Sequence, residues 1–416
     1  MKKYKFIDLF AGCGGLEDGF LQTKKFDCVA SVEWLKPQVN TLRKRLEKKW
    51  KIKDVKEKVL YFDIQRENEL FSGWDDKEFG KSKGLDEIVK TKKGIDIIIG
   101  GPPCQAYSVA GRVRDKNGMH DDYRNYLFEH YINIVNRYKP KMFIFENVPG
   151  ILSAKPKGVD IVSEITKSFK KIGYSISNIL KEIAVINALD YSVPQNRKRV
   201  IILGIKMENK NEEEIQEKIK QFYSEILPKY KTTKKYTVGD AIGDLSHFIP
   251  IWDEENRKER ISYLSEKKEN LNWHKPRYHN LRDMKIYQML AHDIEIGKNE
   301  YVDSKKIVKI YEEYVGSKSP IHRYHVLRKD EPSTTIIAHL HKDGNRFIHY
   351  DSKQARTITP REAARLQSFD DDFEFLGNQG SVYQMIGNAV PPKLAKAIGN
   401  AVFEMMEKLF EEDNNG

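Results

Sequence analysis

The stretch that decides the fold is residues 4–15, which read YKFIDLFAGCGG. Its first half is an apolar run of strand length, and its second half is a Gly-rich turn that precedes a helical stretch. Glycines after a strand let the backbone approach a ligand closely, and an acidic residue about 20 positions further on can hold ribose hydroxyls. Glu33 stands in that place, at the end of the next strand. The pattern favours a nucleotide-type ligand.

Two further residues support a ligand at this edge of the sheet. Trp34 follows Glu33 and offers a ring that can stack on an adenine, and Asp63 follows another short strand and can accept a hydrogen bond from an adenine amino group. A second glycine-containing stretch, residues 73–82, does not fit the phosphate loop of NTPases, because its first glycine stands two positions too early.

The first half of the chain alternates short apolar runs with helical stretches. This alternation predicts an α/β fold with a mostly parallel sheet covered on both faces. The further expected strands are Phe26–Val32, Ile95–Ile99, Met142–Phe145 and Val200–Leu203. The expected helices are Leu35–Lys53, 122–138 and 158–171. The first of these helices has a cationic face of Arg43, Lys44, Arg45, Lys48 and Lys49. Residues 65–93 are polar and are predicted to form a surface insertion.

Charge and cysteine content narrow the class of protein. The 416 residues include 72 Lys/Arg and 61 Asp/Glu, a formal net charge of +11 that is compatible with a nucleic-acid partner. Residues 206–355 hold 28 Lys/Arg against 25 Asp/Glu, so the excess charge is not concentrated there. Within them, residues 257–285 interleave nine basic residues with aromatic ones. This pattern is typical of a nucleic-acid surface and equally of a solvated loop. Three cysteines exclude a disulfide framework. With no signal peptide and no apolar run of membrane-spanning length, we expect a soluble intracellular protein.

A cysteine follows the strand Ile95–Ile99, in the stretch GGPPCQ at residues 100–105. Ligands bind at the carboxyl ends of parallel strands, so Cys104 is placed there for nucleophilic attack; a half-buried structural cysteine is the alternative. A zinc deaminase would need a second cysteine three residues later, where Tyr107 stands.

Two polar stretches follow or precede neighbouring strands. Glu146, with Asn147, ends the strand Met142–Phe145, and its carboxylate is expected to face the same crevice as Cys104. Gln195, Arg197 and Arg199 precede or begin the strand Val200–Leu203, and strand alternation predicts that these three share one face. Arginines on one face suit a phosphate or a base carbonyl, or they form a cationic strand edge.

These stretches, in this order, resemble the cytosine-C5 DNA methyltransferase family of bacterial restriction–modification systems. Residues 6–15 are similar to its cofactor motif, 101–105 to its catalytic-loop motif, 146–148 to its acidic triplet, and Gln195-x-Arg197-x-Arg199 to its Gln-x-Arg-x-Arg element. Residues 356–369 resemble the motif that organises target recognition, with Asp370 where the family usually has Pro, and 387–392 match the last motif.

The resemblance implies a Rossmann-like methyltransferase domain, residues 1–205 with 380–416, and a smaller target-recognition domain, residues 206–379, with DNA between them. It implies S-adenosylmethionine as cofactor and no metal. The implied cofactor-binding residues are Phe10, Gly12, Gly14, Gly15, Glu33, Trp34, Asp63, Ile64, Pro102, Asn388 and Val390; the implied catalytic residues are Cys104, Glu146, Arg197 and Arg199; the implied residues for DNA contact and base flipping are Gln105, Ser108, Asn147 and Gln195.

The implied reaction is attack of the Cys104 thiolate on C6 of a flipped cytosine, followed by methylation at C5. Glu146 would bind the N3 and amino edge of the base, and the two arginines would hold its carbonyl. RNA cytosine-C5 methylation, a tRNA reaction on the same scaffold, and a non-catalytic DNA-binding module stay open as alternatives. Methylation of an exocyclic amine is disfavoured, since it uses no thiol.

The wider expectations concern metals, partners and location. Nine of the eleven histidines lie in 206–355, and His339-x-His341 there is expected, from strand alternation, to serve recognition or packing rather than a metal. We expect double-stranded DNA as partner, a cognate restriction endonuclease acting on the same sites, a monomer, and a cytoplasmic, nucleoid-associated location in a bacterium.

Overall fold

The computed structural model describes residues 3–103, 127–155, 158, 160–208, 211–253, 255, 261–267, 270–316 and 324–410. The chain divides into two compact units. The first unit holds residues 1–191, 198–233 and 390–416, and the second holds 192–197 and 234–389. Each unit is described by itself.

The first unit is built from strands and helices that alternate along the chain. Its strands are β1 (Tyr4–Leu9), β2 (Phe26–Glu33), β3 (Val59–Tyr61), β4 (Trp74–Asp76), β5 (Gly80–Ser82), β6 (Ile97–Gly100), β7 (Met142–Asn147), β8 (Tyr174–Ile176), β9 (Val185–Asn187) and β10 (Lys198–Lys206). Its helices are α1 (Gly15–Gln22), α2 (Lys36–Lys48), α3 (Val55–Lys58), α4 (Glu67–Ser72), α5 (Gly84–Thr91), α7 (Leu127–Tyr138), α8 (Ile161–Lys171), α9 (Leu180–Ile183), α10 (Glu212–Gln221) and α16 (Pro392–Phe410).

The central sheet has the strand order β3-β2-β1-β6-β7-β10-β8, and β9 pairs with β10. Strands β3, β2, β1, β6 and β7 are parallel, whereas β10 runs antiparallel to β7 and β8. This parallel-dominated α/β sheet confirms the predicted fold class. The chain leaves β1 toward β2 on one side and returns to β6 on the other, and a reversal of this kind places a ligand crevice at the carboxyl ends of the two central strands.

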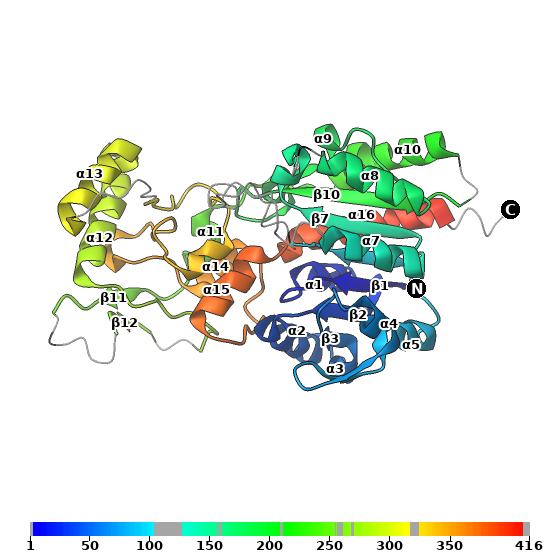
Figure 1. Cartoon of the computed structure of the whole chain (residues 1–416). Helices are drawn as coiled ribbons and strands as arrows, with labels where there is room; N and C mark the ends of the chain where they lie inside the picture. The colour runs from blue at the N-terminus through cyan, green and yellow to red at the C-terminus, as the bar shows by residue number, and fades with distance from the viewer. Residues whose placement is uncertain are drawn as a thin grey trace. The chain divides into compact units, whose positions relative to one another are not determined.

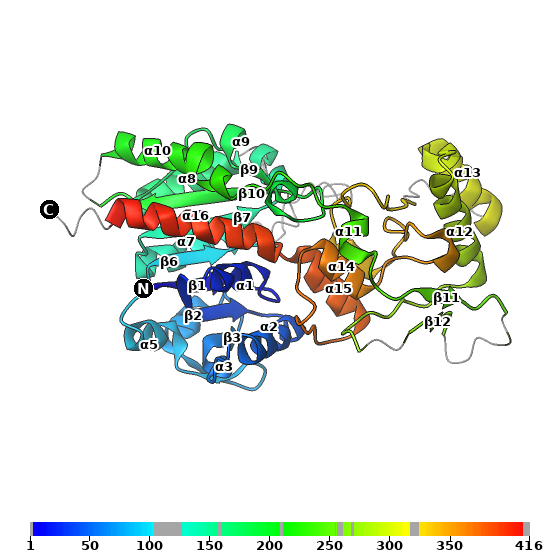
Figure 2. The same cartoon turned by 180° about the vertical axis from the view of Figure 1, so that it is seen from behind.

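Helices cover both faces of the sheet. The two opposite views show α7 and α8 on one face and α1 and α16 on the other (Figures 1 and 2). The central strands are apolar throughout because both faces are covered, and Ile97–Ile99 and Met142–Phe145 are fully buried. Residues 65–93, predicted as a surface insertion, form α4, the β4–β5 hairpin and α5, in which Leu70 and Leu85 are buried.

The boundaries of the two units differ from those expected at residues 205 and 380. Residues 206–233 belong to the first unit, because α10 buries Ile215 and Ile219 and the Gln216 amide donates to Ser175 Oγ and the Ile176 carbonyl. Tyr223 further fixes this segment, since its hydroxyl donates to the Ile201 carbonyl at 2.7 Å.

The second unit consists of short elements and long connections. Its elements are α11 (Val238–Ile242), β11 (Phe248–Pro250), β12 (Tyr263–Ser265), α12 (Leu281–Glu295), α13 (Ser304–Val315), the 3₁₀ turn η9 (Ala338–His341), α14 (Pro360–Leu366) and α15 (Gln379–Asn388). Capping side chains define several of these helices; Thr359 and Glu362 form a capping box at α14, with Pro360 at its first position. One apolar cluster joins α12 and α13 to buried Ile348.

No helix in the described part of the chain is long and apolar enough to cross a membrane.

Candidate active site

The turn after β1 has a backbone that few side chains would allow. Phe10, Gly12 and Gly14 all have positive φ, of 58°, 58° and 89°. A Cβ on Gly14 would lie 2.4 Å from Leu42 Cδ1 of α2, so glycine lets the turn pack against that helix. The Ala11 amide donates to the Val32 carbonyl, which fastens the turn to the end of β2.

Glu33 binds three backbone amides from two segments of this edge. Its Oε2 accepts from the Gly12 amide at 2.9 Å, and its Oε1 accepts from the amides of Trp34 and Leu35 at 3.0 and 2.8 Å. Burial raises the pKa of Glu33, and these three hydrogen bonds oppose that rise. The neighbouring Trp34 ring is 48% exposed, so a flat apolar surface stands open beside the carboxylate.

The second acidic position of this edge lies after β3. Asp63 is half-buried, and its Oδ1 accepts from the Gln65 amide at 3.0 Å, while Ile64 beside it is buried. Because β3 pairs with β2 in parallel, Asp63 and Glu33 follow strands that end at the same edge.

The turn after β6 contacts the end of β7. Gly101 has no room for a side chain, because a Cβ there would lie 2.7 Å from Glu146 Oε2. Asn147 donates from Nδ2 to the carbonyl of buried Pro102 at 3.3 Å, and its Oδ1 accepts from the Val148 amide. The β6 turn, which leads into residue 104, is therefore fixed against the acidic triplet.

Glu146 forms an ion pair with Arg199 on the adjacent antiparallel strand. Arg199 Nε lies 2.9 Å from Glu146 Oε1, and each side chain is 11% exposed. Burial lowers the pKa of Arg199, whereas the charge and hydrogen bonding of Glu146 favour its protonated form. A carboxylate and a guanidinium are thus held together, largely screened from water, at the end of β7.

Arg197 and Gln195 do not share a face with Arg199, which corrects the expected alternation. The strand β10 begins only at Lys198, and residues 192–197 belong to the second unit. There the fully buried Arg197 guanidinium donates to the carbonyls of Ile336, Gly387 and Ala389 at 2.7–3.0 Å. These contacts give Arg197 a structural role, and its expected catalytic role stays a prediction.

Gln195 is likewise part of the interior of the second unit. Its Nε2 donates to the Leu366 carbonyl and to Gln367 Oε1, and its Oε1 accepts from the Ile336 amide. The side chain is fully buried, and its expected role in contacting DNA stays a prediction.

The expected nucleophile Cys104, and Gln105 and Ser108 after it, lie outside the described residues. The other two cysteines, Cys13 and Cys28, are buried. Burial raises the pKa of Cys13 to about 12 and raises that of Cys28 as well, so neither thiol is reactive near neutral pH.

The last motif spans the junction of the two units. Asn388 is exposed at the end of α15 in the second unit, and Val390 is buried in the first. The two carbonyls that Arg197 binds, those of Gly387 and Ala389, flank Asn388. Arg197 therefore fixes the turn that presents Asn388.

Two buried carboxyl groups near the cofactor turn were missed by the sequence analysis. Asp8 in β1 and Glu17 in α1 are 1% and 0% exposed, and Asp8 Oδ2 and Glu17 Oε1 have no hydrogen-bond partner among the described residues. Burial raises the pKa of Asp8 well above its usual range and raises that of Glu17 to about 7, which the Ser31 hydroxyl bond to Glu17 opposes. The available signal was a charged residue within an apolar strand.

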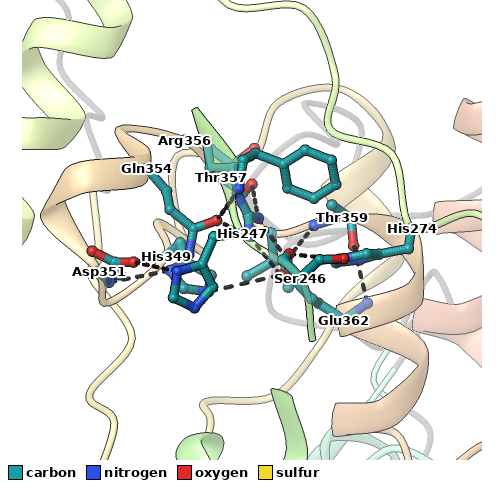
Figure 3. Close-up of polar contacts among 12 residues, drawn as sticks. Ser246, His247, His274, His349, Asp351, Gln354, Arg356, Thr357, Thr359 and Glu362 are labelled. Carbon is teal, nitrogen blue, oxygen red and sulfur yellow. Dashed lines mark hydrogen bonds and ion pairs between the residues drawn. The ribbon is translucent and has the colours of Figure 1, made fainter. Parts of the chain in front are cut away.

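The second unit holds a buried polar network around α14 (Figure 3). Arg356 donates two hydrogen bonds to Glu362, at 2.6 and 2.7 Å, and both side chains are 1% exposed. Burial would raise the pKa of Glu362, but the charge and hydrogen bonds of Arg356 outweigh it and lower that pKa to about 2. Glu362 also accepts from the Thr359 amide, which joins the ion pair to the capping box.

Two histidines complete this network. Burial and the charge of Arg356 lower the pKa of His349 to about 3, so that ring is neutral at pH 7. His274 lies 3.2 Å from Thr359 Oγ1 and 3.0 Å from the Ser246 carbonyl. The stretch expected to organise target recognition is therefore a buried, hydrogen-bonded core that links residues 246–274 to 349–362.

His339 and His341 lie on η9 instead of on the expected strand. His341 Nδ1 is 2.7 Å from the Ala338 carbonyl. Among the described residues, no group of three or more His, Cys, Asp or Glu could hold a metal ion.

Comparisons with known proteins show the family and the fold. The model of the family described as "C-5 cytosine-specific DNA methylase" matches residues 4–404. The type II methyltransferase M.Bpa9945I of Bacillus paralicheniformis is 32% identical over 96% of this chain and 98% of its own length, and M1.HphI of Haemophilus parahaemolyticus is 30% identical over 96% and 87%. A solved Entamoeba histolytica methyltransferase shares the fold, with a TM-score of 0.55, 14% identity and 99% coverage of both chains.

Proposed function

This chain belongs to the C-5 cytosine-specific DNA methylase family, and we propose that it transfers a methyl group from S-adenosylmethionine to C5 of a flipped cytosine in a specific sequence of duplex DNA. The Glu146–Arg199 pair carries the proposal. It is held at 2.9 Å, shielded from water, against the Gly101–Pro102 turn that leads into Cys104.

The residues around the turn after β1 fit the cofactor. Glu33 is fixed by three amides and can accept from ribose hydroxyls, the exposed Trp34 ring can stack on the adenine, and Asp63 can accept from its amino group. When bound, S-adenosylmethionine supplies the methyl group. By family resemblance, the rest of the site comprises Phe10, Gly12, Gly14, Gly15, Ile64, Pro102, Asn388 and Val390.

Cys104 is the proposed nucleophile, and the burial of the other two thiols supports that choice. Its thiolate forms a bond from Sγ to C6, which moves the electron pair of the C5–C6 double bond to C5. C5 would then take the methyl group of the cofactor, whose methyl–sulfur bond breaks with the electron pair left on the sulfur as a neutral thioether. Loss of the C5 proton to a base and departure of the thiolate restore the double bond and the aromatic ring.

Glu146 binds the N3 and amino edge of the flipped base and stabilises the charge that develops there. Arg199 pairs with Glu146, which supports a role in orienting that carboxylate, and we propose that it also holds the base carbonyl. Asn147 supports the turn before Cys104 through Pro102, and Gln105 and Ser108 remain proposed for the gap left by the base.

The test is transfer of labelled methyl from S-adenosylmethionine to unmethylated genomic DNA and, in parallel, to tRNA. We expect label in DNA, its loss in Cys104→Ser with cofactor binding retained, and little change in the control Cys28→Ala. DNA with 5-fluorocytosine at the target should become covalently trapped, because fluorine does not leave as a proton does. Label only in tRNA, or a substantial residual rate in Cys104→Ser, would overturn the substrate or the nucleophile.

The relatives named above are type II methyltransferases, and we propose that this chain likewise protects its sites from an endonuclease with the same recognition sequence. We propose a monomer, because one flipped base needs one active site. Light scattering of the enzyme on a target duplex and cleavage of methylated against unmethylated DNA by the endonuclease test these two points.

A further inference from the structure

Most of the net positive charge of the chain lies in one short segment of the first unit. Residues 36–58 hold ten Lys/Arg and three Asp/Glu, which gives +7 of the total of +11. In contrast, the second unit, residues 192–197 and 234–389, holds 26 Lys/Arg and 24 Asp/Glu, or only +2. The basic excess is thus not in the unit expected to read the DNA sequence.

At least three of the ten cations contact other groups of the fold. Arg45 is buried against Asp18, Arg43 donates to the Val59 carbonyl at 2.7 Å, and Lys58 donates to the Cys28 carbonyl at 2.8 Å. The other seven are exposed or half-exposed on α2, α3 and the loop between them, and we call them the lysine surface: Lys36, Lys44, Lys48, Lys49, Lys51, Lys53 and Lys56.

The lysine surface extends away from the candidate active site. Helix α2 begins three residues after Glu33 and has 13 residues, so it is about 20 Å long. Helix α3 immediately precedes β3 and therefore lies at the amino edge of the sheet, opposite the carboxyl edge that carries the site. Both views show α2 and α3 beside β3, the strand that begins the sheet order (Figures 1 and 2).

The composition of the surface indicates its partner. The apolar side chains of α2, namely Val39, Leu42 and Leu46, are buried, so α2 has no apolar face with which to enter a membrane. Within residues 36–58, all of which the structure describes, no large hydrophobic side chain is among the exposed ones, so none is available to stack on bases. Lysines without stacking partners suit point contacts with phosphates.

We propose that the lysine surface binds the phosphate backbone of a second segment of duplex DNA, distinct from the segment whose cytosine is methylated. The choice of DNA over other polyanions rests on the proposed function. A 20 Å helix spans about six phosphates of one strand, at 3.4 Å each. Such a contact holds the enzyme on DNA without regard to sequence while the site searches for its target.

The test uses a poly(dA)·poly(dT) duplex, which contains no cytosine and therefore no substrate. The variant Lys44→Gln/Lys51→Gln/Lys53→Gln/Lys56→Gln neutralises four members of the surface. The matched control Lys167→Gln/Lys170→Gln/Lys171→Gln/Lys181→Gln removes the same total charge from another exposed part of the first unit, where Lys167, Lys170 and Lys181 pair with carboxylates. Affinity is measured across salt concentrations, with melting temperatures to confirm folding.

Each phosphate contact contributes about 0.9 to the slope of log affinity against log salt, so the slope of the test variant should shrink by about 3 to 4, and that of the control by less than about 1. Single-turnover methylation of a short target duplex should be unchanged in both. Equal slopes in the two variants would overturn the proposal. The proposal would also be overturned if the test variant lost binding to the RNA duplex poly(A)·poly(U) but not to poly(dA)·poly(dT). An equal loss of methylation of the short target duplex in the test variant would overturn it as well. The binding assay needs no methyl transfer, so it tests the lysine surface alone. Failure of the proposed function would appear instead as absence of methylation by the unmodified enzyme.

Discussion

A buried ion pair joins the two helices that begin at the cofactor edge, and its removal gives the sharpest test of the packing. Arg45 of α2 donates to both oxygens of Asp18 in α1, at 2.6 and 3.1 Å, and the two side chains are 1% and 2% exposed. The Trp50 indole and the Gln22 amide also donate to this carboxylate, each at 2.9 Å. Helix α1 starts at the Gly-rich turn and α2 starts beside Glu33, so the pair sets the position of one half of the site against the other.

Arg45→Met removes the cation and leaves a buried carboxylate with two neutral donors. Breaking a buried pair from one side costs about 3–5 kcal/mol, and the two donors that remain favour the lower end. For a unit of this size, each kcal/mol corresponds to about 2–4 °C in melting temperature, so we expect a loss of about 6–12 °C. Asp18→Leu/Arg45→Met replaces the pair by apolar groups and should recover most of this loss.

The assays are urea unfolding followed by tryptophan fluorescence and calorimetric titration with S-adenosylmethionine. We expect the single variant to lose cofactor affinity as well as stability, since the two helix starts are no longer fixed. Lys81→Met, at an exposed pair with Asp75, is the control and should leave both unchanged. Additive effects of the two substitutions, or a cost for Arg45→Met below about 1 kcal/mol, would refute the reasoning.

Three other substitutions test the remaining features. Gly101→Ala should lower the rate of single-turnover methylation by at least about tenfold while cofactor affinity is retained. The new Cβ would lie 2.7 Å from Glu146 Oε2 and displace this carboxylate from the base, which removes binding of the transition state. An unchanged rate would contradict the proposed position of Glu146 against the base. Arg197→Lys should raise the amide hydrogen-exchange rates of residues 334–340 and 385–389, because one ammonium group cannot reach all three carbonyls that Arg197 binds. Reduced catalysis with wild-type exchange rates would instead indicate that Arg197 acts in catalysis. His349 has a folded pKa of about 3, below the unfolded value near 6.5, so the unfolded state binds more protons than the folded state at pH values between 3 and 6.5. The free energy of unfolding of the second unit should therefore fall by about 1.4 kcal/mol per pH unit as the pH drops from 6.5 to 4.5. His349→Phe should flatten that slope in urea titrations, and an unaltered slope would show that His349 is not its source.

Much of the first unit was predictable because its signals are local. An apolar strand, a Gly-rich turn and an acidic residue at the next strand end follow one another within residues 4–33, and the structure joins them through the Glu33 bond to Gly12. The sequence likewise indicated that Glu146 and Arg199 belong near one crevice, and they form an ion pair. The start of β10 pairs antiparallel with the carboxyl end of β7, and this strand pairing brings the two residues together.

The errors arose where tertiary contacts override local pattern. Alternation placed Arg197 and Arg199 on one face, but the strand starts between them, and Arg197 instead satisfies carbonyls of residues 139 to 192 positions away. The boundary at residue 205 failed for a similar reason, because α10 carries apolar side chains that return to the sheet. Neither contact has a signal within a short window of sequence.

The buried acids explain how the carboxyl edge keeps few negative charges. Glu33 accepts three amide hydrogen bonds and Glu146 has Arg199, so each has partners that favour its anionic form. Asp8 Oδ2 has no hydrogen-bond partner among the described residues, and burial raises the pKa of Asp8 well above its usual range and that of Glu17 to about 7. If all four were ionised, their mutual repulsion and their repulsion of DNA phosphates would oppose binding. Desolvation therefore disfavours the charges for which the proposed chemistry has no use, whereas amide hydrogen bonds and the Arg199 ion pair favour those of Glu33 and Glu146, the two carboxylates proposed to bind ligands.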